Sequence, residues 1–386
     1  MSTGHIRPRM SEPSRSVSPA SLAAAIEAGE RVALLDVRNR DEVDAWRIEG
    51  PTVESTHVPY MRFVSAGVTG DVGSLVDPEE SYVVVCPRGE ESAEVVEQLA
   101  EAGIEARNLS GGMTAWADVY RRAEIAAGAT DATVYQYRRP ATGCLGYAVV
   151  DGGEAAIVDP LAAFVDRCVA DAAALGAEIV AVVDTHVHAD HVSGLRALAE
   201  AAGVTPSVPA AAVERGIEYE VDALADGDAL AVGDAELEAR ASPGHTTGSA
   251  SLLVDGVLLA GDSLFLDGVA RPDLQGGDAD PEALAAELYA TLTERFAGLA
   301  DDTVVAPGHV RPGRGGPYTA DLGKLRSRLA AFSEGREAFI ERILGSVGEP
   351  PANHERIVAI NLGRETVDGD AAFELELGPN NCAVAE

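Results

Sequence analysis

Three histidines and an aspartate stand within six residues of the chain, at His186, His188, Asp190 and His191. The motif follows the apolar run 179–184 and leads into a helical pattern, which predicts a strand, a loop and a helix. In an extended loop, His186 and His188 point the same way because they are two residues apart. Imidazole and carboxylate groups at this density are typical of a divalent metal site.

Three further candidate ligands lie downstream, each in a tight-turn context. They are His245 in SerProGlyHis, Asp262 in AlaGlyAspSer and His309 in AlaProGlyHis. Each ends or follows a strand-like run, so each side chain can reach the rim that the first motif occupies. Five of the 8 histidines of the chain belong to this set of seven residues. We therefore expect a metal centre that draws on the whole set.

A cysteine stands at a strand–helix junction in the N-terminal part of the chain. Cys86 ends the apolar run TyrValValValCys, and CysProArgGlyGluGluSer leads directly into a helical pattern from Ser92. Loop amides and a helix N-terminus that face a thiol lower its pKa and stabilise a bound anion. Arg88 adds positive charge, so we predict Cys86 and Arg88 as catalytic residues of this region.

The elements that position these residues fall into two groups. Residues 18–120 alternate short apolar runs with helical patterns, which predicts a mainly parallel α/β sheet. Residues 132–345 carry successive strands between fewer helices, which predicts an α+β or layered sandwich fold. We expect a disordered tail at 1–17, a linker at 121–131 and a C-terminal extension at 346–386 that packs on the second domain.

The motifs of the second domain resemble those of the metallo-β-lactamase superfamily. The resemblance rests on HisValHisAlaAspHis with the later ProGlyHis, GlyAsp and GlyHis, and it covers roughly residues 132–345. It implies a four-layer αββα sandwich with the metal at one edge of the sheets. The metal-binding positions of the superfamily match His186, His188, Asp190, His191, His245, Asp262 and His309.

The segment that follows the GlyAsp motif favours one branch of that superfamily. Its Arg271-x-Asp273-x-Gln pattern resembles persulfide dioxygenases rather than glyoxalase-type thioester hydrolases. This resemblance implies one Fe(II) per chain, bound by His186, His245 and Asp262, with the other four ligand positions supporting them. Arg271 and Asp273 are then the expected substrate-binding residues, with Arg271 holding a substrate carboxylate or the oxidised sulfur product.

Such a ligand set can be matched to a reaction. Two histidines and one carboxylate leave three positions open on Fe(II), enough for a persulfide sulfur and dioxygen together. Zinc in the same cage would instead generate hydroxide for hydrolysis. We therefore expect oxidation of a low-molecular-weight thiol persulfide by O2 to sulfite and free thiol. Two alternatives stay open: a thioester hydrolase of glyoxalase type with two zinc ions, and a non-catalytic sulfur-carrier or persulfide-sensing module.

The Cys86 loop resembles the active-site loop of rhodanese domains, which has a Cys-x-x-Gly-x-x-Ser core. LeuLeuAspValArg at 34–38 and AsnLeuSerGlyGlyMetThrAlaTrp at 108–116 extend the resemblance over residues 18–120. It implies an α/β domain whose cysteine carries a persulfide during sulfur transfer. Glu91 stands where thiosulfate-using members often have Arg, so we expect a persulfide rather than thiosulfate as the donor or acceptor.

The charge of the chain excludes some partners. The 386 residues include 29 Lys and Arg against 63 Asp and Glu, a net charge of −34. Such a surface repels nucleic acid and anionic lipid, so we expect neither as a partner. With Lys324 as the single lysine, the composition is typical of a halophilic protein, because molar salt screens self-repulsion. We expect a cytoplasmic protein without a membrane span, and the oligomeric state stays open.

Overall fold

Buried strands alternate with helices through the first part of the structure. The computed structural model describes residues 15–125, 132–277, 279–376 and 383–385. It divides into a first unit that runs to Val119 and also includes Pro312–Gly316, and a second unit that holds the other described residues from Tyr120 onward. The first unit contains β1 (Ser16–Val17), α1 (Pro19–Glu27), β2 (Val32–Asp36), α2 (Arg40–Ala45), β3 (Val53–His57), α3 (Tyr60–Thr69), β4 (Ser81–Val85), α4 (Glu90–Glu101), β5 (Glu105–Leu109) and α5 (Gly112–Ala117).

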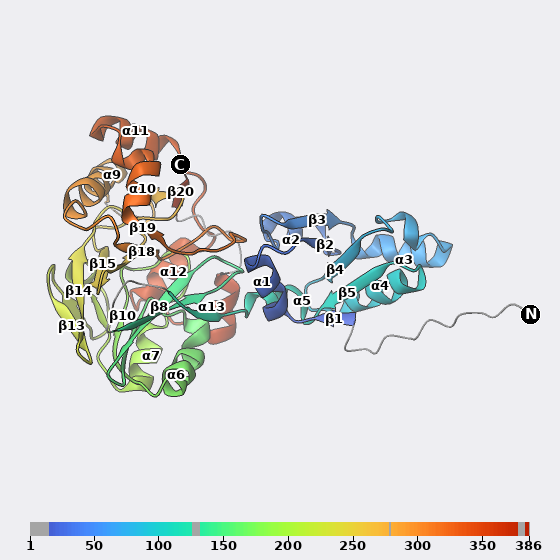
Figure 1. Ribbon diagram of the computed structural model, residues 1–386, viewed down its shortest axis with the longest axis horizontal. Coiled ribbons are helices and arrows are strands. Elements are labelled where there is room, and N and C mark those ends of the chain that lie inside the picture. Colours follow the sequence, from blue (N-terminus) through green and yellow to red (C-terminus); the bar gives the residue numbers. More distant parts are fainter. Residues whose placement is uncertain (1–14, 126–131, 278, 377–382, 386) are drawn as a thin grey trace, which may run out of the picture. The chain divides into compact units, whose positions relative to one another are not determined.

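The sheet of the first unit is parallel throughout, in the order β1-β5-β4-β2-β3 (Figure 1). Every residue of β2 is buried, as expected for a strand that is covered on both faces. Leu35 and Val84 of the sheet pack with Phe63 of α3 and Leu99 of α4 in one core. The predicted α/β fold of this domain is therefore confirmed, and Cys86 directly follows β4, where the carboxyl ends of parallel strands meet.

Two mixed sheets form the centre of the second unit (Figure 1). The first has the order β12-β11-β10-β9-β8-β7-β6, with strands at Asp222–Leu224, Ser207–Pro209, Glu178–Val183, Glu154–Val158, Leu145–Asp151, Thr133–Arg138 and Arg121–Glu124. The second has the order β13-β14-β15-β16-β18-β19, with strands at Ala229–Val232, Ala235–Ala241, Ala250–Val254, Val257–Gly261, Val304–Pro307 and Ala320–Asp321. A short pair joins β17 (Gly268–Ala270) to β20 (Ala383–Ala385).

Helices cover the outer faces of these two sheets. They are α6 (Val165–Ala174), α7 (Leu195–Ala202), α8 (Ala210–Val213), α9 (Pro281–Ala290), α10 (Leu322–Arg328), α11 (Arg336–Gly345), α12 (His354–Asn361) and α13 (Gly369–Leu375). Alternate residues of the strands, such as Val149 and Leu252, share one core between the sheets. The outer face of the first sheet packs on α6 and α7, and that of the second on α9, α10 and α11. The result is the predicted αββα sandwich.

The element boundaries differ from the sequence predictions in two places. Ser16 and Val17, which we assigned to the disordered tail, pair in parallel with β5. Residues 121–124, which we assigned to the linker, form β6 and extend the first sheet of the second unit by pairing with β7. Both strands lie at a sheet edge and carry a weak apolar pattern, so hydrogen bonding to a neighbouring strand, rather than side-chain burial, defines them. Cys382 lies outside the described residues.

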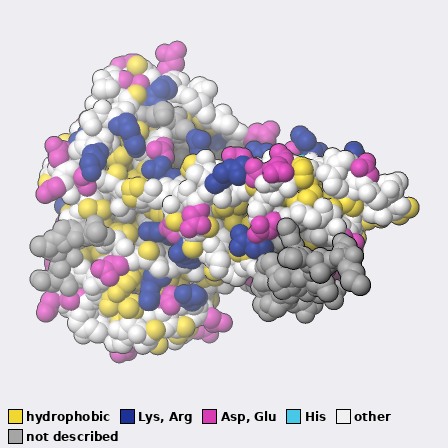
Figure 2. Space-filling model, turned by 45° about the vertical axis from the view of Figure 1, so that its right-hand side comes forward, with side chains coloured by type: hydrophobic (Ala, Val, Ile, Leu, Met, Phe, Trp, Pro, Cys, Tyr) yellow, Lys and Arg dark blue, Asp and Glu magenta, His cyan; other side chains and the backbone are white. Residues whose placement is uncertain are grey.

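The surface carries charged side chains of both signs (Figure 2). On the face that Figure 2 shows, acidic and basic side chains are interspersed among uncharged ones. Among the described residues, no helix has both the length and the apolar character needed to cross a membrane.

Candidate metal centre and candidate sulfur-transfer loop

The seven predicted metal ligands come from four strand ends and are all buried. His186, His188, Asp190 and His191 lie between β10 and α7, while the other three follow β14, β16 and β18. The strands β16 and β18 pair in parallel, so their carboxyl ends bring Asp262 and His309 together. A Cβ atom at Gly308 would collide with the Asp262 carboxylate, which explains the glycine of the ProGlyHis motif. The structure sorts these residues into three separate groups.

The first group is His186, His245 and Asp262. The Nε2 atoms of both histidines lie 3.8 Å from Asp262 Oδ2. All three atoms are buried and have no hydrogen-bond partner. Two imidazole nitrogens and one carboxylate oxygen therefore converge on a shared point, as in a site with two histidines and one carboxylate.

Hydrogen bonds fix the orientation of these three side chains. His245 Nδ1 donates to the carbonyl of Arg271 at 2.9 Å, which leaves Nε2 with its lone pair. Thr185 Oγ1 donates its hydrogen bond to Asp159 Oδ2 at 2.9 Å, so it accepts one from His186 Nδ1 at 3.0 Å. His186 Nε2 is therefore also a free acceptor. Burial, followed by the neighbouring His188, holds the pKa of His186 well below its usual value, so this ring is neutral.

His188 belongs to a second group with Asp159 and Asp184. Its Nε2 lies 3.1 Å from Asp159 Oδ1 and 3.9 Å from Asp184 Oδ1. Burial disfavours charge on this ring, yet the Asp159 carboxylate raises the pKa of His188 overall. Its Nδ1 is buried and has no hydrogen-bond partner. The structure thus ties Nε2 of His188 to Asp159, while the ring stays 4.2 Å from that of His186 and Nδ1 is left available to a metal ion.

The third group is Cys144, Asp190, His191 and His309. His309 bridges two carboxylates, with Nε2 at 2.7 Å from Asp190 Oδ2 and Nδ1 at 2.7 Å from Asp262 Oδ1. Burial opposes charge on His309, but these two carboxylates raise its pKa well above the usual value. Cys144 stands in no metal-binding motif of the sequence. Its position in space, not in the sequence, identifies it.

The buried atoms fit a bound metal ion. His186 Nε2, His188 Nδ1, His191 Nε2, His245 Nε2 and Asp262 Oδ2 are all enclosed without a hydrogen-bond partner. Buried acceptors are normally satisfied, because an unmade hydrogen bond costs about 1–3 kcal/mol. Five unsatisfied acceptors in one region would therefore destabilise the folded state unless a cation binds them. Imidazole and carboxylate donors suit iron and zinc alike.

Residues outside the motif hold the metal-binding loop. Asp159, which has a positive φ of 50°, accepts the backbone N–H of Thr185 at 2.7 Å. Asn361, at the end of α12, donates to the carbonyls of His188 and His191 at 3.0 and 2.9 Å. Sequence reasoning missed both residues. Asp159 stands in ValAspPro just after an apolar strand, which is the one signal that the sequence offers.

A buried ion pair links the C-terminal extension to the same loop. Arg139 pairs with Glu376, and both side chains are 0% exposed. The other carboxylate oxygen of Glu376 accepts the backbone N–H of Val192 at 2.8 Å. Aromatic rings of Phe164 and Phe373 flank the guanidinium at 5.3 and 5.2 Å. Glu376 thus supports the metal-binding loop directly.

The Arg271 side chain has partners other than those we expected. Its guanidinium donates to both carboxylate oxygens of Asp273, at 2.7 and 2.8 Å. It also donates to the carbonyls of Gly348 and Glu349, at 2.7 and 2.9 Å. Arg271 is 2% exposed. In this arrangement Arg271 and Asp273 position the carbonyl that orients His245, which differs from the expected binding of a substrate anion.

In the first unit, the Cys86 thiol is enclosed by its own loop. Its Sγ accepts the backbone N–H of Gly89 at 3.0 Å and lies 3.1 Å from Ser92 Oγ. Ser92 Oγ also lies 2.7 Å from Asn108 Oδ1. A Cβ atom at Gly112, where φ is 60°, would collide with the Cys86 carbonyl, so the start of α5 requires glycine. Cys86 itself is 1% exposed.

The charged residues of this loop lie toward solvent. Arg88 and Glu90 are exposed, and Glu91 is half-buried. A hydrogen bond with Cys86 lowers the pKa of Glu91, and the charge of Arg88 acts in the same direction. The positive charge of Arg88 therefore offsets the negative charge of Glu91. Arg88 makes no direct contact with the thiol in the structure.

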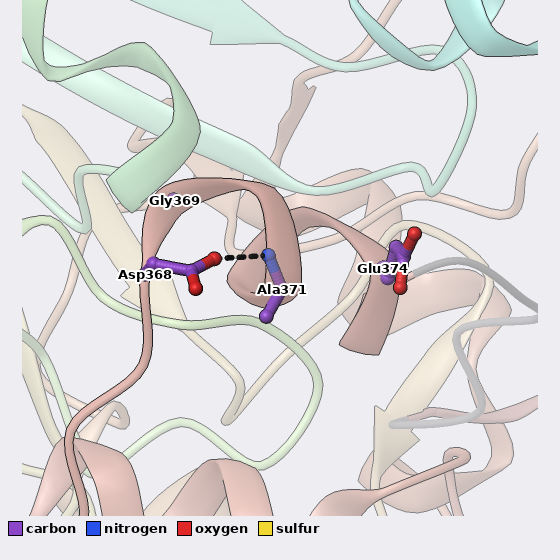
Figure 3. Close-up of a pocket in the computed structure, with 4 residues that line it drawn as sticks. All are labelled: Asp368, Gly369, Ala371 and Glu374. Carbon is purple, nitrogen blue, oxygen red and sulfur yellow. Dashed lines mark hydrogen bonds between the residues drawn. The ribbon is translucent and has the colours of Figure 1, made fainter.

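A hollow of about 460 Å³ lies at the start of α13, lined by Asp368, Gly369, Ala371 and Glu374 (Figure 3). The Asp368 carboxylate accepts the backbone N–H of Ala371 at 2.8 Å and so caps the helix. None of these residues belongs to the three groups above. The hollow is therefore separate from the candidate metal centre.

Comparisons with known proteins agree with this geometry. The model of the metallo-beta-lactamase superfamily matches residues 139–309, and that of the rhodanese-like domain matches residues 18–118. Mitochondrial persulfide dioxygenase ETHE1 of Homo sapiens is 33% identical over 162 residues, which cover 40% of this chain and 59% of the human protein. The chain thus spans less than two thirds of the length of this relative.

Two further similarities cover more of the related protein. A hydroxyacylglutathione hydrolase of Rhodobacter capsulatus is 31% identical over 205 residues, covering 51% of this chain and 72% of that protein. The crystal structure of ETHE1 from Myxococcus xanthus aligns with a TM-score of 0.53 at 28% identity, covering 60% of this chain and 98% of that chain.

Proposed function

The chain belongs to the metallo-beta-lactamase superfamily and carries a rhodanese-like domain ahead of its metal-binding domain, and on this basis we propose that it is an iron-dependent persulfide dioxygenase. Its substrates would be a low-molecular-weight thiol persulfide and O2. One persulfide, one O2 and one water give one thiol and one sulfurous acid, which ionises to sulfite. The terminal sulfur loses four electrons, and O2 accepts them.

The convergence of His186, His245 and Asp262 on one shared point carries this proposal. A zinc hydrolase needs histidines grouped around hydroxide, whereas an oxygenase needs a three-donor face that leaves positions for two ligands. The three converging atoms are Nε2 of both histidines and Oδ2 of Asp262. The similarity to persulfide dioxygenases over the metal-binding domain supports the same choice.

The protein's own residues prepare the site for that chemistry. Fe(II) bound by His186, His245 and Asp262 would supply electrons to O2 and open positions for the persulfide sulfur. Thr185 and the carbonyl of Arg271 keep the protons of the two histidines on Nδ1. His309 donates to Asp262 Oδ1 and thereby turns Oδ2 toward the histidines. The seven ligand positions are at most 7% exposed, so bulk water is excluded.

Oxygen consumption tests the proposal. The full chain, purified without oxygen and loaded with Fe(II), should consume O2 on addition of glutathione persulfide and release sulfite. His186→Ala should lose bound iron and at least about 100-fold in rate, because even residues that only support a ligand are worth 10–100-fold. His354→Ala is the matched control, since His354 lies outside all three groups. Hydrolysis of S-lactoylglutathione without O2 uptake contradicts the proposal.

The second candidate is a two-zinc thioester hydrolase. The complete set of seven ligand positions and the similarity to hydroxyacylglutathione hydrolases favour it. Elemental analysis of the purified chain distinguishes the two: one iron per chain supports the dioxygenase, and two zinc ions without iron support the hydrolase.

For the first domain, we propose that Cys86 carries a transferable sulfur. The Gly89 amide and Ser92 hydroxyl that surround Sγ would stabilise a thiolate and the sulfur bound to it. Glu90 and Glu91 disfavour a dianionic donor such as thiosulfate. Intact-protein mass spectrometry after brief exposure to persulfide should show one added sulfur in the wild type. A gain that persists in Cys86→Ser assigns the carrier to another residue.

A further inference from the structure

The Ser92 hydroxyl lies between two acceptors in the Cys86 loop. Ser92 is in the first turn of α4 and is fully buried. Its Oγ lies 3.1 Å from Cys86 Sγ and 2.7 Å from Asn108 Oδ1. Asn108 belongs to β5, which pairs in parallel with the strand that leads to Cys86. A hydroxyl has one proton to donate, so Ser92 cannot serve both acceptors at once.

A second hydrogen bond fixes the orientation of the Asn108 amide. Its Nδ2 donates to the carbonyl of Gly89 at 2.9 Å. A carbonyl oxygen only accepts, so the amide nitrogen must face Gly89 and Oδ1 must face Ser92. Because Oδ1 has no proton of its own, Ser92 is the donor in the 2.7 Å contact. Asn108 therefore draws the Ser92 proton away from the sulfur.

This arrangement satisfies the loop while Cys86 is a protonated thiol. The Gly89 N–H donates to Sγ at 3.0 Å. A hydrogen bond also joins the thiol to the Glu91 carboxylate, and an ionised carboxylate only accepts, so the S–H group is its donor. Ser92 is then free to donate to Asn108.

Loss of the S–H proton changes the balance between the two acceptors. Glu91 then faces a charge of its own sign, and the charge of Arg88 acts on Glu91. The Gly89 amide and the Ser92 hydroxyl are the donors to Sγ that the described residues supply. A hydrogen bond to a charged acceptor is stronger than one to a neutral acceptor, so the thiolate takes the Ser92 proton. Asn108 Oδ1 loses its hydrogen bond in exchange.

We infer that Asn108 is a positioning residue of the sulfur-transfer loop: it competes with Cys86 for the Ser92 proton and so disfavours negative charge on Sγ. This inference rests on the proposed role of Cys86 as a sulfur carrier. In loading, the thiolate attacks the outer sulfur of a persulfide, a bond from Sγ to that sulfur forms, and the S–S bond of the donor breaks. The electron pair of that bond leaves on the carrier thiolate, so there is no net oxidation. Because Sγ is then uncharged, Asn108 recovers the Ser92 proton, which favours the sulfur-loaded form over the bare thiolate.

The ultraviolet absorbance of the thiolate tests the inference. Titration of the full chain with pH, with Cys86→Ser as the blank for all other groups, gives the fraction of Cys86 that is ionised. Asn108→Leu removes the competing acceptor, so this fraction below the midpoint should rise by about 2–10-fold, the size of one neutral hydrogen bond. Ser92→Ala removes the donor and should lower the fraction by at least about threefold. Thr114→Val is the matched control, because it removes a hydrogen bond to the Pro87 carbonyl of the same loop and should leave the titration unchanged.

The double variant separates competition for the proton from damage to the loop. In the Ser92→Ala protein, Asn108→Leu should have no further effect, because no proton remains to compete for. An unchanged or lowered thiolate fraction in Asn108→Leu overturns the inference. The same rise in the Ser92→Ala background also overturns it, since Asn108 would then act without Ser92.

A second measurement uses the wild type alone. In nuclear magnetic resonance, the side-chain carbonyl carbon of Asn108 should shift with the same midpoint as the thiolate absorbance, because it loses the hydrogen bond from Ser92 there. A resonance that stays constant through the titration overturns the inference even if Asn108→Leu misfolds. Neither readout requires sulfur transfer. If both agree while Cys86 loads no sulfur, the proposed carrier role is wrong and the competition for the proton stands; loading without competition has the opposite meaning.

Discussion

The Cys86 loop and the metal-binding loop both follow a buried strand that pairs in parallel with its neighbours, yet they are held in different ways. The Cys86 loop is held by four residues that all lie within 26 residues of the cysteine: Gly89, Ser92, Asn108 and Gly112. The metal-binding loop needs Asn361, more than 165 residues downstream, and Glu376 beyond it. Segments close in the sequence are enough to position a single thiol, but several converging ligands need support from several parts of the chain.

Breaking the buried pair of Arg139 and Glu376 should give the largest effect among the tests of this difference. Arg139→Ala leaves the Glu376 carboxylate buried without its partner, so the free energy of unfolding of the metal-binding domain should fall by about 3–5 kcal/mol. Lys324→Ala removes an exposed pair with Asp321 and should cost less than about 1 kcal/mol. Chemical denaturation compares the two. Equal effects contradict the assignment of Arg139 and Glu376 as support for the loop.

Removing the Asn361 amide should affect metal binding more than folding. Asn361→Ala leaves the carbonyls of His188 and His191 without that donor, so metal affinity should fall by about 10–100-fold. Sulfur loading on Cys86 should not change. Arg356→Ala, an exposed residue of the same helix, is the control for competition with a chelator. Unchanged affinity in Asn361→Ala shows that the loop keeps its shape without the amide.

Glycine variants test the first loop in the same way. Gly112→Ala should cost about 1–2 kcal/mol for a positive φ, and more for the collision of Cβ with the Cys86 loop. Gly103→Ala has the same backbone penalty, with φ of 83°, but its Cβ meets nothing within 4 Å. The difference between the two variants measures the collision alone. Sulfur loading on Cys86 should be slowed only in Gly112→Ala, and a similar loss in both variants would remove the collision as the cause.

The smallest expected effect concerns pH. The hydrogen bond with Cys86 lowers the pKa of Glu91 below 4.5, so the folded state binds this proton less readily than the unfolded state. The carboxylate therefore stabilises the first domain above about pH 4.5, and this contribution is lost as pH falls through the lower folded value. In Glu91→Gln, stability should fall less steeply between about pH 5 and 3. Identical pH profiles for the variant and wild type contradict the Cys86–Glu91 hydrogen bond.

The same contrast explains what could be predicted from the sequence. The residues of the Cys86 loop and the seven metal-binding positions stand in short motifs, so their residue types and spacing identify them. Asp159 and Asn361 are single polar residues at the end of a strand and of a helix, and only the fold shows what they contact. For Arg271, the sequence could not show that Asp273 and two backbone carbonyls occupy its guanidinium.

The dependence of the metal-binding loop on Asn361 and Glu376 also sets an order of events during synthesis. The first domain has all of its sheet by residue 109 and can fold while the ribosome is still adding the second. The metal-binding loop, in contrast, cannot be fully supported until residue 376 has left the ribosome. During translation its histidines are therefore exposed to metal ions before their final neighbours arrive.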